Sequence, residues 1–287
     1  MNKEKDGLAK PGRTLQDLNL CDDFLFGEVM SDERICRRVL EKILEIKIGR
    51  ITYLDSQVSL NPIHDAHGIR MDVQARDEKG TVFTVEMQGQ QKYNESRRSR
   101  YYHSLMDADH LLKKGTGYSA LPDNYVIFIC AFDMFSLGRH IYRFSNICED
   151  DRKTYLDDGQ HTIVLNTEGT EDDVDDEMKA FLSYAKESTD ENAECADSLL
   201  VRDIHEKVQF VKNNQKAGER FMKLELLLNE KQEEGFEQGR AEGLSYAVLK
   251  LKDSGMSEEK ISQALSISEE EVSRMLQQRD QKEIDQA

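Results

Sequence analysis

Two carboxylates in neighbouring strand-like segments are spaced so that they meet on one face. Residues 68–76 and 81–88 alternate with a period of two, and Gly80 supplies the left-handed residue of a three-residue hairpin loop between them. In this register Asp72 lies directly opposite Glu86, with Cβ atoms about 4.5–5.5 Å apart. Such a pair repels by roughly 1 kcal/mol or more unless a cation lies between the carboxylates. The pair therefore predicts a divalent metal site, and hard oxygen ligands favour Mg²⁺ or Mn²⁺.

The segment after the acid pair is basic and rich in tyrosine. Residues 88–118 carry six lysines and arginines against three acids, although the whole chain has a net charge of −17. A basic helix from about Glu95 to Lys114 beside two carboxylates suits a phosphodiester substrate, because basic and tyrosine side chains contact phosphate oxygens. The alternative is an exposed acid pair that holds no metal. The residues expected to contact DNA are Arg97, Arg98, Arg100, Tyr101, Tyr102, Lys113 and Lys114.

The elements that position these residues predict a mixed α/β fold. Two helices are expected within residues 15–48, with a break near Ser31-Asp32, because apolar residues recur there at three- and four-residue steps. Strands are expected within residues 51–60, 68–76, 81–88, 124–135, 140–148 and 161–167. We therefore expect an α/β fold, with a mixed β-sheet core flanked by helices and an all-helical C-terminal tail.

Composition divides the chain into four expected parts. Residues 171–197 contain eleven acidic residues and only two lysines, which predicts a solvated segment around a short helix. The expected parts are a sheet core at 1–169, an acidic linker and helix at 170–198, a helical extension at 199–245 and a small helix-turn-helix-like unit at 246–287.

The helical tail carries features of a contact region. Gly235, Gly239 and Gly243 are four residues apart and line one helix face, which suits either a close helix contact or a hinge. Ser268 and Glu271 form a capping box that opens the last helix. That helix begins with three glutamates, which phosphate would repel, so packing or protein contact is favoured over major-groove reading. We expect the C-terminal helices to support a homo-oligomer.

The overall composition limits the class of protein. No stretch approaches the roughly 18 consecutive apolar residues of a membrane span, so no membrane contact is expected. The polar N-terminal segment lacks the apolar region of a signal peptide. The five cysteines contain no C-x-x-C pair, which is typical of reduced thiols and not of a disulfide framework. These features favour a cytoplasmic location.

Three motifs resemble one nuclease family. V-E-M-Q lies at 85–88, R-x-x-Y-Y at 98–102 and a glycine-spaced E-E-G-x-E-x-G segment at 233–239. From about Asp17 to Gly243 the chain is similar to the PD-(D/E)XK nuclease superfamily, specifically to the Rpn recombination-promoting nucleases, which are also described as transposases. The resemblance implies a restriction-endonuclease-like core and a Mg²⁺-dependent DNA endonuclease associated with recombination, mobile elements or phage and genome defence. It also implies catalytic Asp72, Glu86 and Gln88, with the metal held by Asp72, Glu86 and the Met87 carbonyl.

Two positions depart from the usual superfamily pattern or extend it. Gln88 lies where most of the superfamily has lysine, and an amide can orient a water but supplies no charge. Arg98 and Lys92 are candidates for the missing cation. Glu28 resembles the auxiliary acid that some members contribute from their first helix; an exposed helical glutamate is the alternative.

A second function and a second metal site also fit the sequence. The chain could be a non-catalytic DNA- or partner-binding remnant of a transposase-like protein, in which case DNA binding would persist in EDTA. His64 and His67 lie three residues apart in an expected loop, but no third ligand accompanies them. The acid pair is therefore the favoured site.

Overall fold

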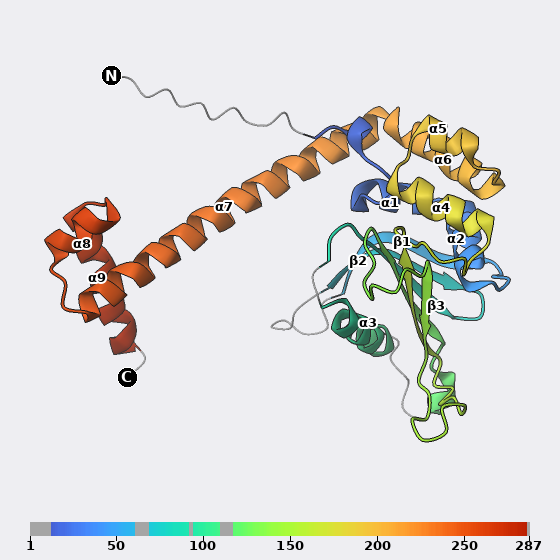
Figure 1. The fold of residues 1–287 in the computed structure, drawn as a ribbon, viewed down its shortest axis with the longest axis horizontal. Helices are drawn as coiled ribbons and strands as arrows, with labels where there is room; N and C mark the ends of the chain where they lie inside the picture. Colours follow the sequence, from blue (N-terminus) through green and yellow to red (C-terminus); the bar gives the residue numbers. More distant parts are fainter. Residues whose placement is uncertain (1–12, 61–68, 92–93, 110–116, 286–287) are drawn as a thin grey trace. The chain divides into compact units, whose positions relative to one another are not determined.

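A mixed sheet forms the centre of the first of two compact units, Met1–Phe221 and Met222–Ala287. The computed structural model describes residues 13–60, 69–91, 94–109 and 117–285 (Figure 1). Within those residues six strands form one sheet in the order β1-β2-β3-β4-β6-β5. The strands are β1 (Ile51–Leu60), β2 (Ile69–Asp77), β3 (Val82–Gln88), β4 (Asn124–Cys130), β5 (Ile141–Phe144) and β6 (Gln160–Asn166).

Strand direction changes at the middle of this sheet. β1, β2 and β3 form an antiparallel meander, whereas β3, β4 and β6 run parallel, and β5 pairs antiparallel with β6. β3 is buried along its whole length and β4 along nearly all of it. Burial on both faces explains why β4 has a continuous apolar sequence. The expected mixed α/β sheet is therefore confirmed.

Helices cover both faces of the sheet, as Figure 1 shows. α1 (Asp23–Met30) and α2 (Glu33–Leu44) pack on one face, and α3 (Glu95–Asp109) packs on the other. The break predicted between the first two helices is confirmed, since the Asp32 side chain accepts the Arg34 and Ile35 N–H groups and so begins α2. Among the described connections are two short 3₁₀ turns, η1 (Leu15–Asp17) and η2 (Tyr118–Ala120).

The acidic segment forms helices that add a further layer. α4 (Asp176–Lys186) and α5 (Asp190–Cys195) both pack against α6 (Leu199–Lys212), which in turn packs on α1 and α2. Asp175 and Thr189 cap the N-termini of α4 and α5. Acidic side chains in the first turn of each helix interact favourably with the positive end of the helix dipole. The acids therefore stabilise helix starts as well as facing solvent.

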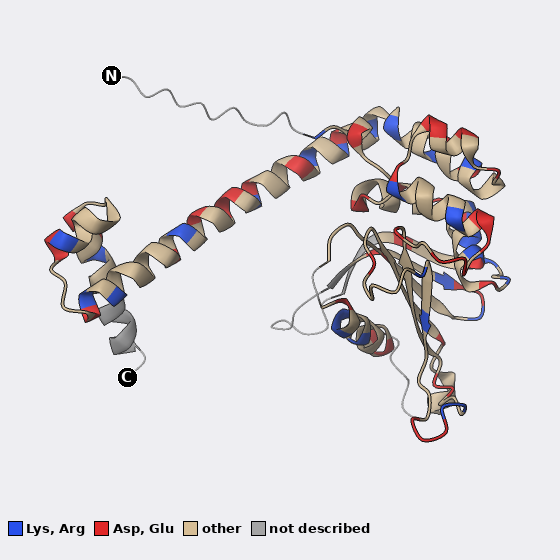
Figure 2. Ribbon diagram, viewed as in Figure 1, with Lys and Arg blue, Asp and Glu red and all other residues tan. Residues whose placement is uncertain are grey.

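The second unit contains most of α7 (Gln215–Asp253), α8 (Glu258–Leu265) and α9 (Glu269–Asp285). Its core is built on Val248, Ile261 and Val272, and the predicted capping box is confirmed by the reciprocal hydrogen bonds of Ser268 and Glu271. The glycine stripe lies in open space on a continuous helix, with no described atom within 4 Å of where its Cβ atoms would be. Charged residues of both signs recur along α7 (Figure 2).

Candidate active site

The hairpin of β2 and β3 brings the two predicted carboxylates together. The strands pair with Val73 opposite Val85 and Gln74 opposite Thr84, which is the predicted register. Gly80 closes the turn with a φ of 89°, a left-handed conformation that glycine adopts without strain. The hairpin expected from the alternation and the turn residues is therefore confirmed.

At the end of this hairpin the carboxylates themselves bond to the opposite strand. Glu86 Oε1 accepts the Asp72 N–H at 3.1 Å, and Asp72 Oδ2 accepts the Met87 N–H at 2.8 Å. Each acid is therefore tied to the backbone beside the other acid. The reciprocal contacts hold the two side chains next to each other at the end of the paired hairpin.

Burial gives Glu86 an unusual protonation equilibrium. Its side chain is 2% exposed, and burial followed by the charge of Asp72 raises its pKa to about 8, although the Asp72 N–H, Arg98 and Tyr102 favour the charged form. Asp72 is only half-buried. Without a metal, Glu86 therefore holds a proton near neutral pH, which relieves the repulsion between the two acids.

Helix α3 places a guanidinium and a phenol over the acid pair. Arg98 Nη2 lies 3.3 Å from Glu86 Oε2 and 2.8 Å from the Tyr102 hydroxyl, which donates to Glu86 Oε2 at 3.2 Å. Arg98 Nη1 also donates to Gln88 Oε1 at 2.7 Å, and Gln88 Nε2 donates to the Met87 carbonyl at 2.8 Å. The positively charged Arg98 therefore bonds directly to Gln88, the residue expected to take the place of the usual lysine.

The other residues expected to contact DNA fall into different surroundings. Arg97 and Arg100 are exposed, whereas Tyr101 is half-buried and packs against the cluster between α3 and the sheet. Tyr102 is 3% exposed, so the structure places it inside the acid-pair site and not on a surface open to DNA. The remaining predicted residues, Lys92, Lys113, Lys114, His64 and His67, lie outside the described residues.

The proposed auxiliary acid has a partner from another helix. Glu28 Oε2 pairs with Arg220 Nη2 of α7 at 2.6 Å. The preceding residue, Gly27, brings α1 against the strand that carries Asp72, because a Cβ at Gly27 would lie 3.9 Å from the Asp72 carbonyl oxygen. Glu28 thus lies on a helix that touches the acid-pair strand, with its carboxylate engaged by Arg220.

Sequence analysis did not identify the polar network that anchors α3. His103 Nε2 lies 2.9 Å from the Thr162 hydroxyl, and His103 Nδ1 contacts the Asn124 side chain. Asn124 Nδ2 also donates to Asp107 at 2.8 Å. Burial lowers the pKa of His103, although Asn124 opposes that shift. These contacts fix the position of the helix that carries Arg98. The sequence signal for the orientation of this helix was the four-residue spacing of Arg98 and Tyr102, which places both side chains on one helix face.

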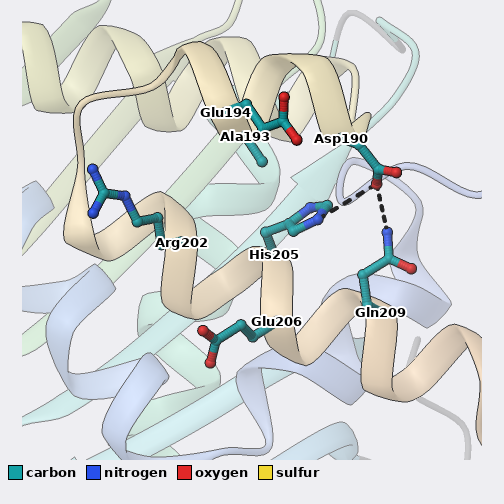
Figure 3. Close-up of a pocket in the computed structure, with 7 residues that line it drawn as sticks. All are labelled: Asp190, Ala193, Glu194, Arg202, His205, Glu206 and Gln209. Carbon is teal, nitrogen blue, oxygen red and sulfur yellow. Dashed lines mark hydrogen bonds and ion pairs between the residues drawn. The ribbon is translucent and has the colours of Figure 1, made fainter.

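A separate pocket of about 560 Å³ lies between α5 and α6 (Figure 3). Asp190 contacts both His205 Nε2 at 3.4 Å and Gln209 Nε2 at 3.0 Å there, and His205 Nδ1 lies 2.9 Å from the Tyr184 hydroxyl. The pocket belongs to the helix layer on the sheet face opposite α3. It is therefore not part of the acid-pair site.

The donor set around the acid pair fits a divalent metal of the magnesium type. Within the described part of the chain no group of three or more His, Cys, Asp or Glu side chains could hold a metal. Mg²⁺, however, commonly uses one or two carboxylates and completes its shell with water and substrate phosphate. Asp72, Glu86 and the Met87 carbonyl supply only hard oxygen ligands, as that metal requires.

A mixed sheet with paired acids at the end of a central hairpin and an arginine-bearing helix alongside is consistent with a restriction-endonuclease-like fold. Residues 22–234 match the family described as PD-(D/E)XK nuclease family transposase, and the chain belongs to this family. No match was found among curated proteins or among solved structures. None of the described helices is long and apolar enough to cross a membrane.

Proposed function

We propose that this chain is a metal-dependent DNA endonuclease that uses Mg²⁺ or Mn²⁺ and acts in the cytoplasm in recombination, mobile-element or defence reactions. The observation that carries the proposal is the pair of Asp72 and Glu86. Glu86 forms an ion pair with Arg98, and Arg98 in turn donates a hydrogen bond to Gln88. Family membership supports a nuclease. All five cysteines are free thiols, which suits a reducing compartment.

The chain's own residues divide the work of phosphodiester hydrolysis. Asp72, Glu86 and the Met87 carbonyl would hold the metal, which when bound lowers the pKa of water and neutralises charge on the phosphate. Gln88 would orient a water through its amide, and Arg98, which donates to Gln88, would supply the positive charge that the amide lacks. Together, Arg98 and Gln88 would replace the two functions of a lysine.

The test of this function is cleavage of a supercoiled plasmid by the full chain. We expect nicking in Mg²⁺ or Mn²⁺ and none in EDTA, measured as conversion of supercoiled to open-circular or linear DNA. DNA binding without cleavage under every metal condition would instead identify a non-catalytic remnant of a transposase-like protein.

Phosphate contacts on α3 should give this nuclease its affinity for DNA. Arg97 and Arg100 are the exposed arginines of that helix, and a phosphate contact carries no sequence information. Replacing both with alanine is expected to weaken binding by about tenfold for all sequences alike, and to reduce the salt dependence of binding by roughly two phosphate contacts. Titration of labelled duplexes at several salt concentrations measures both effects; unchanged affinity and salt slope would contradict the assignment.

The C-terminal helices should assemble or regulate the enzyme. Their core around Val248, Ile261 and Val272 is small, and a unit of this size gains stability by docking. A chain that ends at Asn229 keeps Arg220 and its contact with Glu28. We expect it to retain metal-dependent nicking while its oligomeric state or specific activity changes, measured by light scattering and plasmid assay. A folded but inactive truncation would show that the tail takes part in cleavage.

A further inference from the structure

The guanidinium of Arg98 lies closer to two neutral acceptors than to the carboxylate that it faces. Its Nη1 atom is 2.7 Å from Gln88 Oε1, and its Nη2 atom is 2.8 Å from the Tyr102 hydroxyl oxygen. The distance from Nη2 to Glu86 Oε2 is 3.3 Å. Bonds between a guanidinium and a carboxylate are typically about 2.7–2.9 Å long and are often bidentate. The contact between Arg98 and Glu86 is therefore longer than the usual ion pair.

The Tyr102 hydroxyl lies between the two charged groups. It accepts a hydrogen bond from Arg98 Nη2 and donates one to Glu86 Oε2 at 3.2 Å. Because an arginine N–H only donates and a tyrosine hydroxyl has a single hydrogen, the direction of both bonds is fixed. The Tyr102 side chain is 3% exposed, so bulk water does not compete for these bonds. Tyr102 thus takes up a donor of Arg98 that faces Glu86.

Helix α3 is also anchored to the sheet by contacts that do not involve the Tyr102 hydroxyl. His103 Nε2, on the next residue of the helix, lies 2.9 Å from the hydroxyl oxygen of Thr162 on β6. The Tyr102 ring itself belongs to the apolar cluster between α3 and the sheet. Loss of the hydroxyl alone should therefore leave the helix in place. It would release Nη2 of Arg98 to close on Glu86.

A guanidinium that closes on Glu86 would compete with a metal ion. Asp72 and Glu86 are the carboxylates proposed above to hold Mg²⁺. A close pair with Arg98 would place a positive charge on the Glu86 oxygens that the metal needs. The metal would then have to displace Arg98 before it could bind.

We propose that Tyr102 is a positioning residue that holds Arg98 away from Glu86 and so keeps the acid pair open to a metal ion. This role rests on the metal-dependent nuclease function proposed above. Tyr102 acts through Arg98 and not through contact with the DNA. The same bond holds the Arg98 charge beside Gln88, where hydrolysis would use it.

Mg²⁺ binding in the absence of DNA tests this role independently of cleavage. The full-length chain and Y102F, which keeps the ring and loses only the hydroxyl, are titrated with Mg²⁺ in a calorimeter. At pH 9, above the Glu86 pKa of about 8, a proton on Glu86 does not compete strongly with the metal. We expect Y102F to bind Mg²⁺ about tenfold more weakly, since loss of a residue that orients metal ligands typically costs 10–100-fold.

Tyr142 provides a matched control for the loss of a buried hydroxyl. Its side chain is 8% exposed, it belongs to the same apolar cluster, and its hydroxyl donates to Asp133 at 3.0 Å. Y142F therefore loses the same kind of bond to a carboxylate, and we expect its Mg²⁺ affinity to be unchanged. Circular dichroism verifies that both variants fold. Equal Mg²⁺ affinities for Y102F and Y142F would overturn the role of Tyr102.

A double-mutant cycle with R98M tests whether Tyr102 acts through Arg98. We expect the loss of the Tyr102 hydroxyl to weaken Mg²⁺ binding about tenfold when Arg98 is present and to have no effect in R98M, because no guanidinium is left to close on Glu86. A hydroxyl that only supports the fold, or that acts on Glu86 directly, would give the same loss in both backgrounds. That result would overturn the proposal.

Plasmid nicking at several Mg²⁺ concentrations separates this inference from the function on which it rests. We expect Y102F to nick slowly at low Mg²⁺ and to approach the normal rate as Mg²⁺ is raised, because the metal then displaces Arg98. Normal nicking by the unaltered chain, together with normal Mg²⁺ binding by Y102F, would overturn the role of Tyr102 but not the nuclease. If the unaltered chain neither binds Mg²⁺ nor nicks DNA, the nuclease function and the role of Tyr102 are both overturned.

Discussion

Asp72→Ala and Glu86→Ala are each expected to abolish metal-dependent DNA cleavage while leaving the fold intact. Loss of a residue that only orients a metal ligand typically costs 10–100-fold, so loss of a ligand should cost more than about a hundredfold. The fold should survive, because each change removes one side chain at the end of the hairpin, whereas the pairing of Val73 with Val85 and the turn at Gly80 stay in place. Plasmid nicking in Mg²⁺ and in Mn²⁺ measures the effect, and circular dichroism verifies the fold.

A matched control for this experiment lies on the neighbouring strand. Asp55 is an exposed acid of β1, opposite Gln74 in the register. Asp55→Ala removes the same charge from the same sheet, and we expect it to cleave at the normal rate. Full cleavage by either acid-pair variant, or loss of cleavage in the Asp55 variant, would show that the acid pair is not the active site.

The hairpin could be predicted from sequence because its determinants are local. Alternation of polarity fixes which side chains share a face, and Gly80 fixes the turn and hence the register. The same holds for the start of α2 at Asp32 and for the capping box of the last helix. In each case the residues that decide the geometry are within a few positions of one another.

The surroundings of the acid pair could not be predicted in this way. Tyr102 was expected to contact DNA, yet it is buried and its hydroxyl bonds to Glu86, sixteen positions away. The burial of Glu86 likewise depends on α3 and on β4, which are not adjacent to it in sequence. Side-chain orientation toward distant elements, and the pKa that follows from burial, become visible only when the fold is assembled.

Burial of Glu86 predicts a measurable dependence of stability on pH. Its pKa is about 8 in the folded chain, whereas an ordinary glutamate has a value of 4.5. The folded state therefore binds this proton more tightly than the unfolded state, and the stabilisation present below pH 4.5 is lost as pH rises toward 8. Glu86→Gln removes the titration, so we expect the variant to gain stability relative to the unaltered chain as pH rises from 5 to 9.

As the pH rises, the gain in the free energy of unfolding of Glu86→Gln relative to the unaltered chain should be on the order of a few kcal/mol. One pKa unit corresponds to about 1.4 kcal/mol, and the acid pair titrates jointly. Thermal melts of both proteins in EDTA at pH 5, 7 and 9 measure it as a widening difference in Tm. Glutamine also changes hydrogen bonds, but that contribution to the Tm difference is the same at every pH, so it cancels when the differences at several pH values are compared. Mg²⁺ should narrow the difference at high pH, because the metal binds the charged carboxylate and stabilises only the unaltered chain. A difference in Tm that stays constant with pH would show that Glu86 is charged throughout and that Arg98 and Tyr102 fully compensate its burial.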